Sequence, residues 1–237
     1  DEKGHITTWT YDSLNRQKSV TDAAGYTLTY GYDPAGNRTS ATNAKGHTMT
    51  WSYDRLNREE NITDAYGAVI SRKLYDENGN LFKEIDAKGY LSASDDSARY
   101  GTLYSYDLAN RLTGVAKPEA AAKGKVTETY KYNPYGDRTS IADALGNTTA
   151  YEYDNGGNLI KVTDALGVAI FYGYDKAGNK IYMTDGRGKT TSYSYGAFGK
   201  LARMADAENK EITYQYDLAG NLAAEVDRNG VTTLYAY

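Results

Sequence analysis

Tyrosine recurs along this chain at a fixed spacing, and no other feature limits the possible fold as strongly. The intervals between successive copies are 21, 21, 22, 31, 26, 21, 21, 21, 21 and 21 residues, so seven of the ten are identical. Such a period predicts an array of small structural repeats, each of which contacts its neighbours. We expect one array over residues 1–237, irregular over residues 65–125. The recurring tyrosines, taken as position 0 of each repeat, are Tyr11, Tyr32, Tyr53, Tyr75, Tyr106, Tyr132, Tyr153, Tyr174, Tyr195, Tyr216 and Tyr237.

Two turn signals occur in each repeat. Asp at +1 is followed by Gly or Asn at +4, and Asp at +11 is followed by Gly or Asn at +14. Gly and Asn tolerate a positive φ, so each turn is predicted to have one left-handed residue, and the Asp side chain is predicted to accept hydrogen bonds from backbone amides. The glycine column at +14 includes Gly89. Asparagine replaces glycine in these columns at Asn15, Asn57, Asn110 and Asn209.

The segments between the turns alternate in the manner of β-strands. In residues 27–32, Leu28, Tyr30 and Tyr32 share one face and the threonines share the other. Each repeat is therefore predicted to be one β-hairpin, and the fold to be an all-β array of antiparallel hairpins. About 21 strands at about 4.8 Å spacing would make a sheet about 100 Å wide. Because open sheets rarely exceed about ten strands without curling, we expect a curled or spiralling sheet that forms part of a hollow shell.

The irregular intervals predict local departures from this plan. One extra residue between Gly67 and Tyr75 predicts a β-bulge over residues 69–73, and Lys73 stands where other repeats have an aromatic residue. Ten extra residues after Gly89 predict a loop over residues 91–103 that includes Ser94, Asp95, Asp96 and Ser97. Five extra residues around 117–124 predict one short helical turn. Both insertions are expected at the Asp-x-x-Gly edge of the sheet, close together.

Composition excludes several classes of function. The net charge is −4, from 27 basic and 31 acidic residues, which is unlike a nucleic-acid-binding protein. The chain has no cysteine and only two histidines, His5 and His47, so disulfides, thiolate metal sites and most histidine chemistry are out of reach. No apolar run approaches the roughly 18 residues of a membrane span. We predict no catalytic, cofactor or metal site.

Three functional interpretations of the repeated columns compete with structural ones. The Asp columns are favoured as turn caps over calcium ligands, because they lie at opposite ends of a hairpin and a calcium site needs six to eight converging oxygens. The repeated carboxylates are also unlike a glycosidase pair. Aromatic residues at position −2 are favoured as cross-strand packing, with ring stacking on a glycan as the alternative. The candidates for glycan stacking are Trp9, Tyr30 and Trp51.

Blocks such as Tyr-Asp-Asn-Gly-Gly-Asn-Leu at residues 153–159, followed by Val-Thr-Asp-Ala-Leu-Gly at 162–167, resemble the YD or Rhs repeat. In that family, successive repeats wind into a large hollow β-shell. Its members include bacterial Rhs polymorphic toxins, the cocoon component of insecticidal Tc toxins and animal teneurins. The resemblance implies a non-enzymatic scaffold within a longer, secreted or surface-delivered bacterial protein, with an enclosed toxic C-terminal domain as its partner. The alternative is an extracellular carbohydrate-binding or adhesion module.

Overall fold

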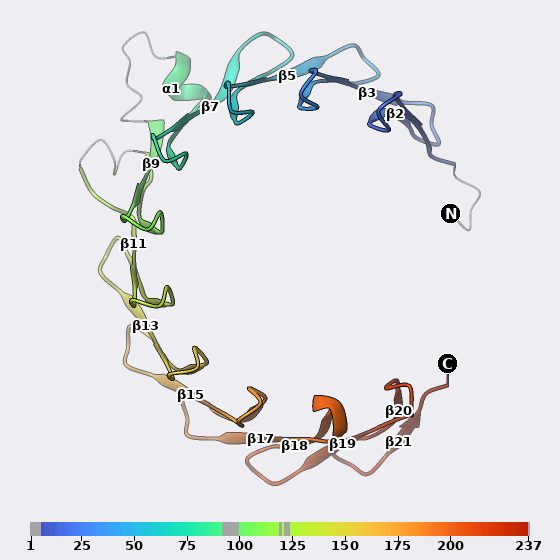
Figure 1. Cartoon of the computed structure of the whole chain (residues 1–237), viewed down its shortest axis with the longest axis vertical. Coiled ribbons are helices and arrows are strands. Elements are labelled where there is room, and N and C mark those ends of the chain that lie inside the picture. Colours follow the sequence, from blue (N-terminus) through green and yellow to red (C-terminus); the bar gives the residue numbers. More distant parts are fainter. Residues whose placement is uncertain (1–5, 92–99, 119, 121–123, 237) are drawn as a thin grey trace. The chain divides into compact units, whose positions relative to one another are not determined.

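A computed structural model describes residues 6–91, 100–118, 120 and 124–236 of the chain. Its strands pair in antiparallel ladders, which confirms the all-β prediction. The chain divides into two compact units, residues 1–128 (unit 1) and residues 129–237 (unit 2). Each unit is a run of hairpins that follows a curved path (Figure 1). None of the helices in the described ranges is long and apolar enough to cross a membrane.

Unit 1 contains ten strands and one short helix, and an eleventh strand begins at its last residue. In chain order they are β1 (Thr8–Tyr11), β2 (Gln17–Thr21), β3 (Thr27–Tyr32), β4 (Arg38–Thr42), β5 (Thr48–Tyr53), β6 (Glu59–Thr63), β7 (Val69–Tyr75), β8 (Leu81–Asp86), α1 (Ala87–Leu91), β9 (Gly101–Tyr106), β10 (Leu112–Ala116) and β11 (Glu128–Tyr132).

Unit 2 continues with ten further strands and one turn of 3₁₀ helix. They are β12 (Arg138–Asp143), β13 (Thr148–Tyr153), β14 (Leu159–Thr163), β15 (Ala169–Tyr174), β16 (Lys180–Thr184), β17 (Thr190–Tyr195), η2 (Ala197–Gly199), β18 (Leu201–Ala205), β19 (Glu211–Tyr216), β20 (Leu222–Val226) and β21 (Thr232–Leu234).

Strands β1–β10 form a continuous series in which each strand pairs with the next one in the chain, and β12–β21 form a second such series in unit 2. In β3 and β4, Tyr30 lies opposite Ala41, but Tyr32 lies opposite Arg38 rather than Thr39. The same skip recurs in the other hairpins closed by a Tyr-Asp turn, so a β-bulge at +7 is part of the repeat. The sequence did not predict this regular bulge.

The turn chemistry follows the prediction. In the first Tyr-Asp turn, Asp12 Oδ1 accepts hydrogen bonds from the backbone amides of Leu14 and Arg16, both at 2.9 Å. The Asn15 amide donates to the Asp12 carbonyl at 3.0 Å. The four asparagines in the glycine columns all have φ between 59° and 60°, which confirms the left-handed assignment.

The core is thin, as expected for a sheet with period-two aromatic rows. Among the described residues, the apolar side chains that are buried are Ile85 and Val115 in unit 1 and Ala205 and Ala224 in unit 2. Most other strand residues are half-buried. Burial of large side chains therefore contributes less here than contacts between neighbouring strands.

The prediction for Gly89 was wrong. Gly89 lies in α1 and is not among the glycines with positive φ. Asp86 Oδ1 accepts hydrogen bonds from the amides of Lys88 at 2.9 Å and Gly89 at 3.0 Å, so this aspartate caps a helix instead of closing a hairpin. A β-carbon on Gly89 would lie 2.6 Å from Ile85 Cγ2 and 2.8 Å from Tyr100 Cβ. Glycine is required there for close packing rather than for backbone conformation.

The predicted bulge in β7 is confirmed. Ile62 pairs with Ser71 and Thr63 pairs with Val69, so Ile70 is the extra residue and the rest of β7 keeps the normal register. Lys73 consequently stays in the position of the aromatic row, and the bulge does not explain its substitution. Its ammonium group instead lies 2.7 Å from Glu59 Oε1, and this hydrogen bond raises the pKa of Lys73.

The two insertions lie at the predicted edge. α1 begins where β8 ends, at the Asp-x-x-Gly end of the hairpin (Figure 1). Tyr100 and Pro118, one from each insertion, line the same cavity of about 160 Å³, which confirms that these parts of the insertions are close. The predicted loop is shorter than expected because β9 begins at Gly101. Residues 94–97, and residues 119 and 121–123 of the predicted helical turn, lie outside the described residues.

Candidate functional site

The position-0 tyrosine links each hairpin to the one before it through its hydroxyl group. The hydroxyl donates to the backbone carbonyl at +6 of the preceding repeat, over distances of 2.8–3.0 Å. We call this set of contacts the hairpin seam. The pairs include Tyr32–Gln17, Tyr53–Arg38, Tyr75–Glu59 and Tyr106–Leu81 in unit 1, and Tyr153–Arg138, Tyr174–Leu159, Tyr195–Lys180 and Tyr216–Leu201 in unit 2.

The regular bulge explains why this carbonyl is the acceptor. The ladder between β2 and β3 begins at Ser19, so Gln17 lies outside it. A backbone carbonyl without a ladder partner needs another donor, and the Tyr32 hydroxyl supplies one. Burial is the largest cause that raises the pKa of Tyr153 and Tyr174, so these hydroxyls keep their protons at neutral pH and remain donors.

Cations occupy the faces of the aromatic rings along the seam. At +5, the Arg16 guanidinium lies 4.6 Å from the centre of the Tyr32 ring, and Arg58 lies 4.3 Å from the Tyr75 ring. At +6, a single cation lies over two rings of neighbouring hairpins. These bridging groups are Arg38 over Tyr30 and Trp51, Arg138 over Tyr130 and Tyr151, and Lys180 over Tyr172 and Tyr193. The contacts made at +5, and one of the two contacts of each bridging cation, add a cation–π attraction between adjacent hairpins.

The residues at +1 and +5 of the Tyr-Asp turn also pair with each other through their side chains. In one type the cation at +5 binds the aspartate, as Arg16 binds Asp12 at 2.7 Å. In another type asparagine replaces the cation, and one turn carries the exchanged pair Asn133–Asp137. The other pairs are Arg58–Asp54, Arg111–Asp107, Asn37–Asp33, Asn80–Asp76, Asn158–Asp154, Asn179–Asp175 and Asn221–Asp217. The remaining turn, which follows Tyr195, has Gly196 at +1 and Lys200 at +5, so it cannot form such a pair.

Asparagine side chains join some neighbouring turns directly. Asn37 Nδ2 donates to Asn57 Oδ1 at 2.9 Å, and Asn80 Nδ2 donates to Asn110 Oδ1 at the same distance. At Asn57 and Asn110, asparagine at +4 therefore does more than tolerate a left-handed backbone, because it also accepts a hydrogen bond from the preceding hairpin. The sequence signal was the pairing of Asn at +5 in one repeat with Asn at +4 in the next.

The three residues predicted to stack on a glycan are not equivalent. Arg38 lies 5.4 Å from the Tyr30 ring centre and 5.0 Å from the Trp51 ring centre, so it occupies a face of each ring that a sugar would need. Trp9 is 54% exposed at the first strand. Glycan stacking stays a prediction, and among the three residues Trp9 has the most accessible ring.

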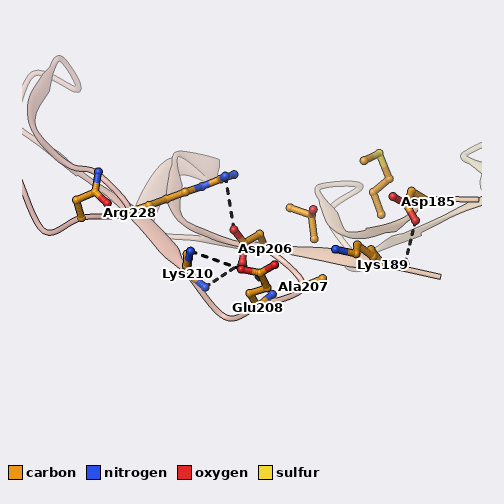
Figure 2. Close-up of a pocket in the computed structure, with 10 residues that line it drawn as sticks. Asp185, Lys189, Asp206, Ala207, Glu208, Lys210 and Arg228 are labelled. Atoms are coloured by element: carbon orange, nitrogen blue, oxygen red, sulfur yellow. Dashed lines mark hydrogen bonds and ion pairs between the residues drawn. The ribbon is translucent and has the colours of Figure 1, made fainter. Parts of the chain in front are cut away.

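A charged pocket of about 440 Å³ lies at the Asp-x-x-Gly edge of unit 2 (Figure 2). Three successive turns contribute to it. Arg228 Nη1 lies 3.5 Å from Asp206 Oδ2, and Lys210 Nζ lies 3.5 Å from Glu208 Oε2. Asp185 accepts hydrogen bonds from the amides of its own turn, which lower its pKa. The basic side chains Arg228 and Lys210 therefore each lie near an acidic side chain, as is common in ion pairs on a solvated surface.

Across the part of the chain that the structure describes, no three His, Asp or Glu side chains are grouped so that they could hold a metal ion. The repeated Asp oxygens instead bind amides and side chains of their own turns. The arrangement with the most consistent geometry is the hairpin seam, and what it can do is hold one hairpin against the next.

Comparisons with known proteins agree with this geometry. Residues 11–48, 132–169 and 197–233 match the family model described as RHS Repeat. The crystal structure of TcdB2-TccC3-TEV superimposes with a TM-score of 0.69 and 16% identity, covering 98% of this chain and 13% of that one. TcdB2-TccC3 without its hypervariable C-terminal region gives a TM-score of 0.57 and 16% identity, over 100% and 16% of the two chains. No curated protein matches the sequence.

At this identity, the likeness to the solved structures concerns the fold alone. The chain spans 13% and 16% of the length of these two structural relatives. The hairpin array therefore corresponds to a small part of the length of those chains.

Proposed function

The chain carries RHS repeats, and from this premise we propose that it forms part of the wall of a structural β-shell that encloses another segment of a longer, secreted or surface-delivered bacterial protein. The observation that carries this proposal is the hairpin seam. The same tyrosine-to-carbonyl bond recurs in both units, at 2.8 Å in Tyr32 and 3.0 Å in Tyr216. A wall that must extend over a long distance needs a joint that every added hairpin can repeat.

The thin core supports a wall rather than a filled domain. Few apolar side chains of the described residues are buried, and the contacts that repeat are made between neighbours in the sheet. Burial of apolar side chains adds little stability to a sheet of this kind, because each hairpin is stabilised mainly by its contacts with the next one. Its role is to hold a surface in place, and in this proposal it contributes no catalytic group.

The enclosed partner is proposed to be a toxic C-terminal domain of the same polypeptide. The Rhs resemblance supports this assignment, and the shared fold with the TcdB2-TccC3 structures is consistent with it. The Rhs resemblance also supports the proposed location outside the producing cell.

Limited proteolysis of the full-length protein that contains this chain tests the proposal. We expect segments outside the array to be digested at once, and the enclosed segment to be protected. A double variant, Tyr53→Phe with Tyr174→Phe, removes one seam hydrogen bond from each unit and should increase cleavage of the enclosed segment. Tyr135→Phe is the matched control, because this tyrosine is 92% exposed on a turn. Equal digestion of all segments in the wild-type protein would contradict enclosure.

A further inference from the structure

The turn over residues 195–200 in unit 2 lacks a feature that all nine other Tyr-Asp turns possess, a side-chain pair between +1 and +5. In three related turns, the cation at +5 lies 2.6–2.7 Å from the aspartate at +1. Gly196 takes the place of that aspartate. Within the described ranges, Lys200 Nζ has no carboxylate at ion-pair distance. This turn therefore keeps the cation of the repeat and loses its counter-ion.

The backbone of the same turn is strained. Phe198 has φ 61° and ψ 23°, which is the left-handed region, and Gly199 follows with φ 68°. A bulky residue in that region costs about 1–2 kcal/mol. The Phe198 side chain is 100% exposed, so no packing within the chain offsets this cost. Strain of this kind at an exposed position is typical of a binding surface.

A pocket of about 610 Å³ lies between this turn and the next Tyr-Asp turn. Phe198 and Leu218, which are both fully exposed and come from the two successive turns, line this pocket. Lys200 also lines the pocket, and its ammonium group lies 5.5 Å from the centre of the Tyr216 ring. The pocket thus offers two apolar walls and one cation held over an aromatic face.

One acidic side chain, Asp217, also lines this pocket. Its carboxylate oxygens accept hydrogen bonds from the Asn221 amide at 2.8 Å and from Asn221 Nδ2 at 3.0 Å. These bonds are the usual pair of its own turn, so Asp217 does not replace the counter-ion that Lys200 lacks.

We propose that this pocket docks an acidic polypeptide segment, with a carboxylate of the segment bound to Lys200 and an adjacent apolar side chain between Phe198 and Leu218. Charge complementarity identifies the partner. The incoming carboxylate takes the place that Asp12, Asp54 and Asp107 occupy in the related turns, where it meets the same +5 cation. The inference concerns the surface of unit 2 and does not depend on whether the array encloses another segment.

Titration of the whole chain with two peptides tests this docking site. The probe is acetyl-Leu-Asp-Leu-amide, and acetyl-Leu-Asn-Leu-amide is the same peptide without the charge. We expect the amide resonances of Gly196, Phe198 and Gly220 to shift with the acidic peptide, and the Asn peptide to bind at least about tenfold more weakly. Equal affinities, or no saturable shift up to about 10 mM, would overturn the proposal.

A variant that restores the missing aspartate provides the second arm. Gly196→Asp should pair with Lys200, raise the melting temperature and weaken binding of the acidic peptide about tenfold or more. Lys176→Met, on the exposed part of the preceding turn, should leave both properties unchanged. Unchanged peptide binding by a folded Gly196→Asp variant would show that Lys200 is not the anchor, and would contradict the assignment.

Discussion

At Asn57, one side chain meets two separate requirements of the repeat. Its φ of 60° is the left-handed conformation that the Tyr-Asp turn needs, and its amide oxygen accepts the hydrogen bond from Asn37. Glycine satisfies the first requirement and not the second. From the sequence alone, Asn57→Gly is expected to be nearly neutral, and the structure revises that expectation.

We predict that Asn57→Gly lowers the free energy of unfolding by about 0.5–1 kcal/mol, the typical net contribution of one hydrogen bond. Asn57→Val should cost more, because a β-branched residue adds backbone strain at this φ. Urea unfolding followed by circular dichroism measures both. The matched control is Asn15→Gly, since Asn15 has the same φ and its side chain makes no hydrogen bond within the part of the chain that the structure describes. If Asn15→Gly lowers the free energy of unfolding as much as Asn57→Gly does, the hydrogen bond from Asn37 contributes nothing to stability.

The turn aspartates predict how stability depends on pH. In Asp12 the backbone hydrogen bond from Arg16 is the largest cause that lowers the pKa, and in Asp33 it is the side-chain hydrogen bond from Asn37. A carboxyl whose pKa is lower in the folded state stabilises that state above its unfolded pKa, and this contribution is lost as the pH falls through the folded pKa.

The melting temperature should therefore stay constant from neutral pH down to about pH 5, and should fall below about pH 4. Thermal unfolding across this range, at constant ionic strength, measures the dependence. A melting temperature that rises on acidification would show that the aspartates are not held as carboxylates by their turns.

At the scale of the hairpin, the seam hydrogen bond is the joint that recurs. The Tyr174 hydroxyl donates to the Leu159 carbonyl at 3.0 Å, and this carbonyl lies outside the β14–β15 ladder. Tyr174→Phe removes the donor and leaves the ring in place. We predict a loss of about 0.5–1.5 kcal/mol in the free energy of unfolding. Tyr135→Phe should cost nothing measurable, and similar costs for the two variants would contradict a role for the seam bond.

The helix α1 gives an element-scale prediction of a different kind. Gly89→Ala would place a methyl group within 3 Å of the Ile85 and Tyr100 side chains. We expect a loss of about 1–3 kcal/mol from overpacking. Ile85→Leu in the same background should recover part of that loss, because leucine lacks the Cγ2 methyl group that the new methyl group would contact. If Gly89→Ala unfolds at the same urea concentration as the wild type, the close packing of α1 is not real.

The hairpins, both turn types and the left-handed asparagines could be predicted from the sequence because each depends on residues near one another in the chain. The seam could not, because the acceptor of each tyrosine depends on a bulge at +7 that no glycine or proline column marks. Gly89 was misassigned for a related reason. The sequence Asp-x-x-Gly can close a hairpin or cap a helix. Only the packing of Tyr100 against α1 distinguishes the two outcomes here.

At the scale of the whole molecule, the central claim is that one period of 21 residues is a complete structural unit, joined to its neighbours by the seam. In unit 2 this claim has a simple consequence. Removing residues 154–174 joins Tyr153 directly to Asp175, so a Tyr-Asp turn is regenerated and Lys180 meets Tyr151 in place of Tyr172. Every remaining strand would still pair antiparallel with its neighbours in the chain.

Urea unfolding of this 21-residue deletion tests the claim most directly, with a deletion of residues 154–163 as its control. We predict that the first variant folds cooperatively, with a strand signal and an m-value reduced roughly in proportion to the missing hairpin, since m follows the surface exposed on unfolding. The control should lose structure in unit 2, because it removes the single strand β14 and so reverses the direction of every later strand. Loss of folding in the first variant, or equal folding of both, would contradict the claim that the period is the unit of this structure.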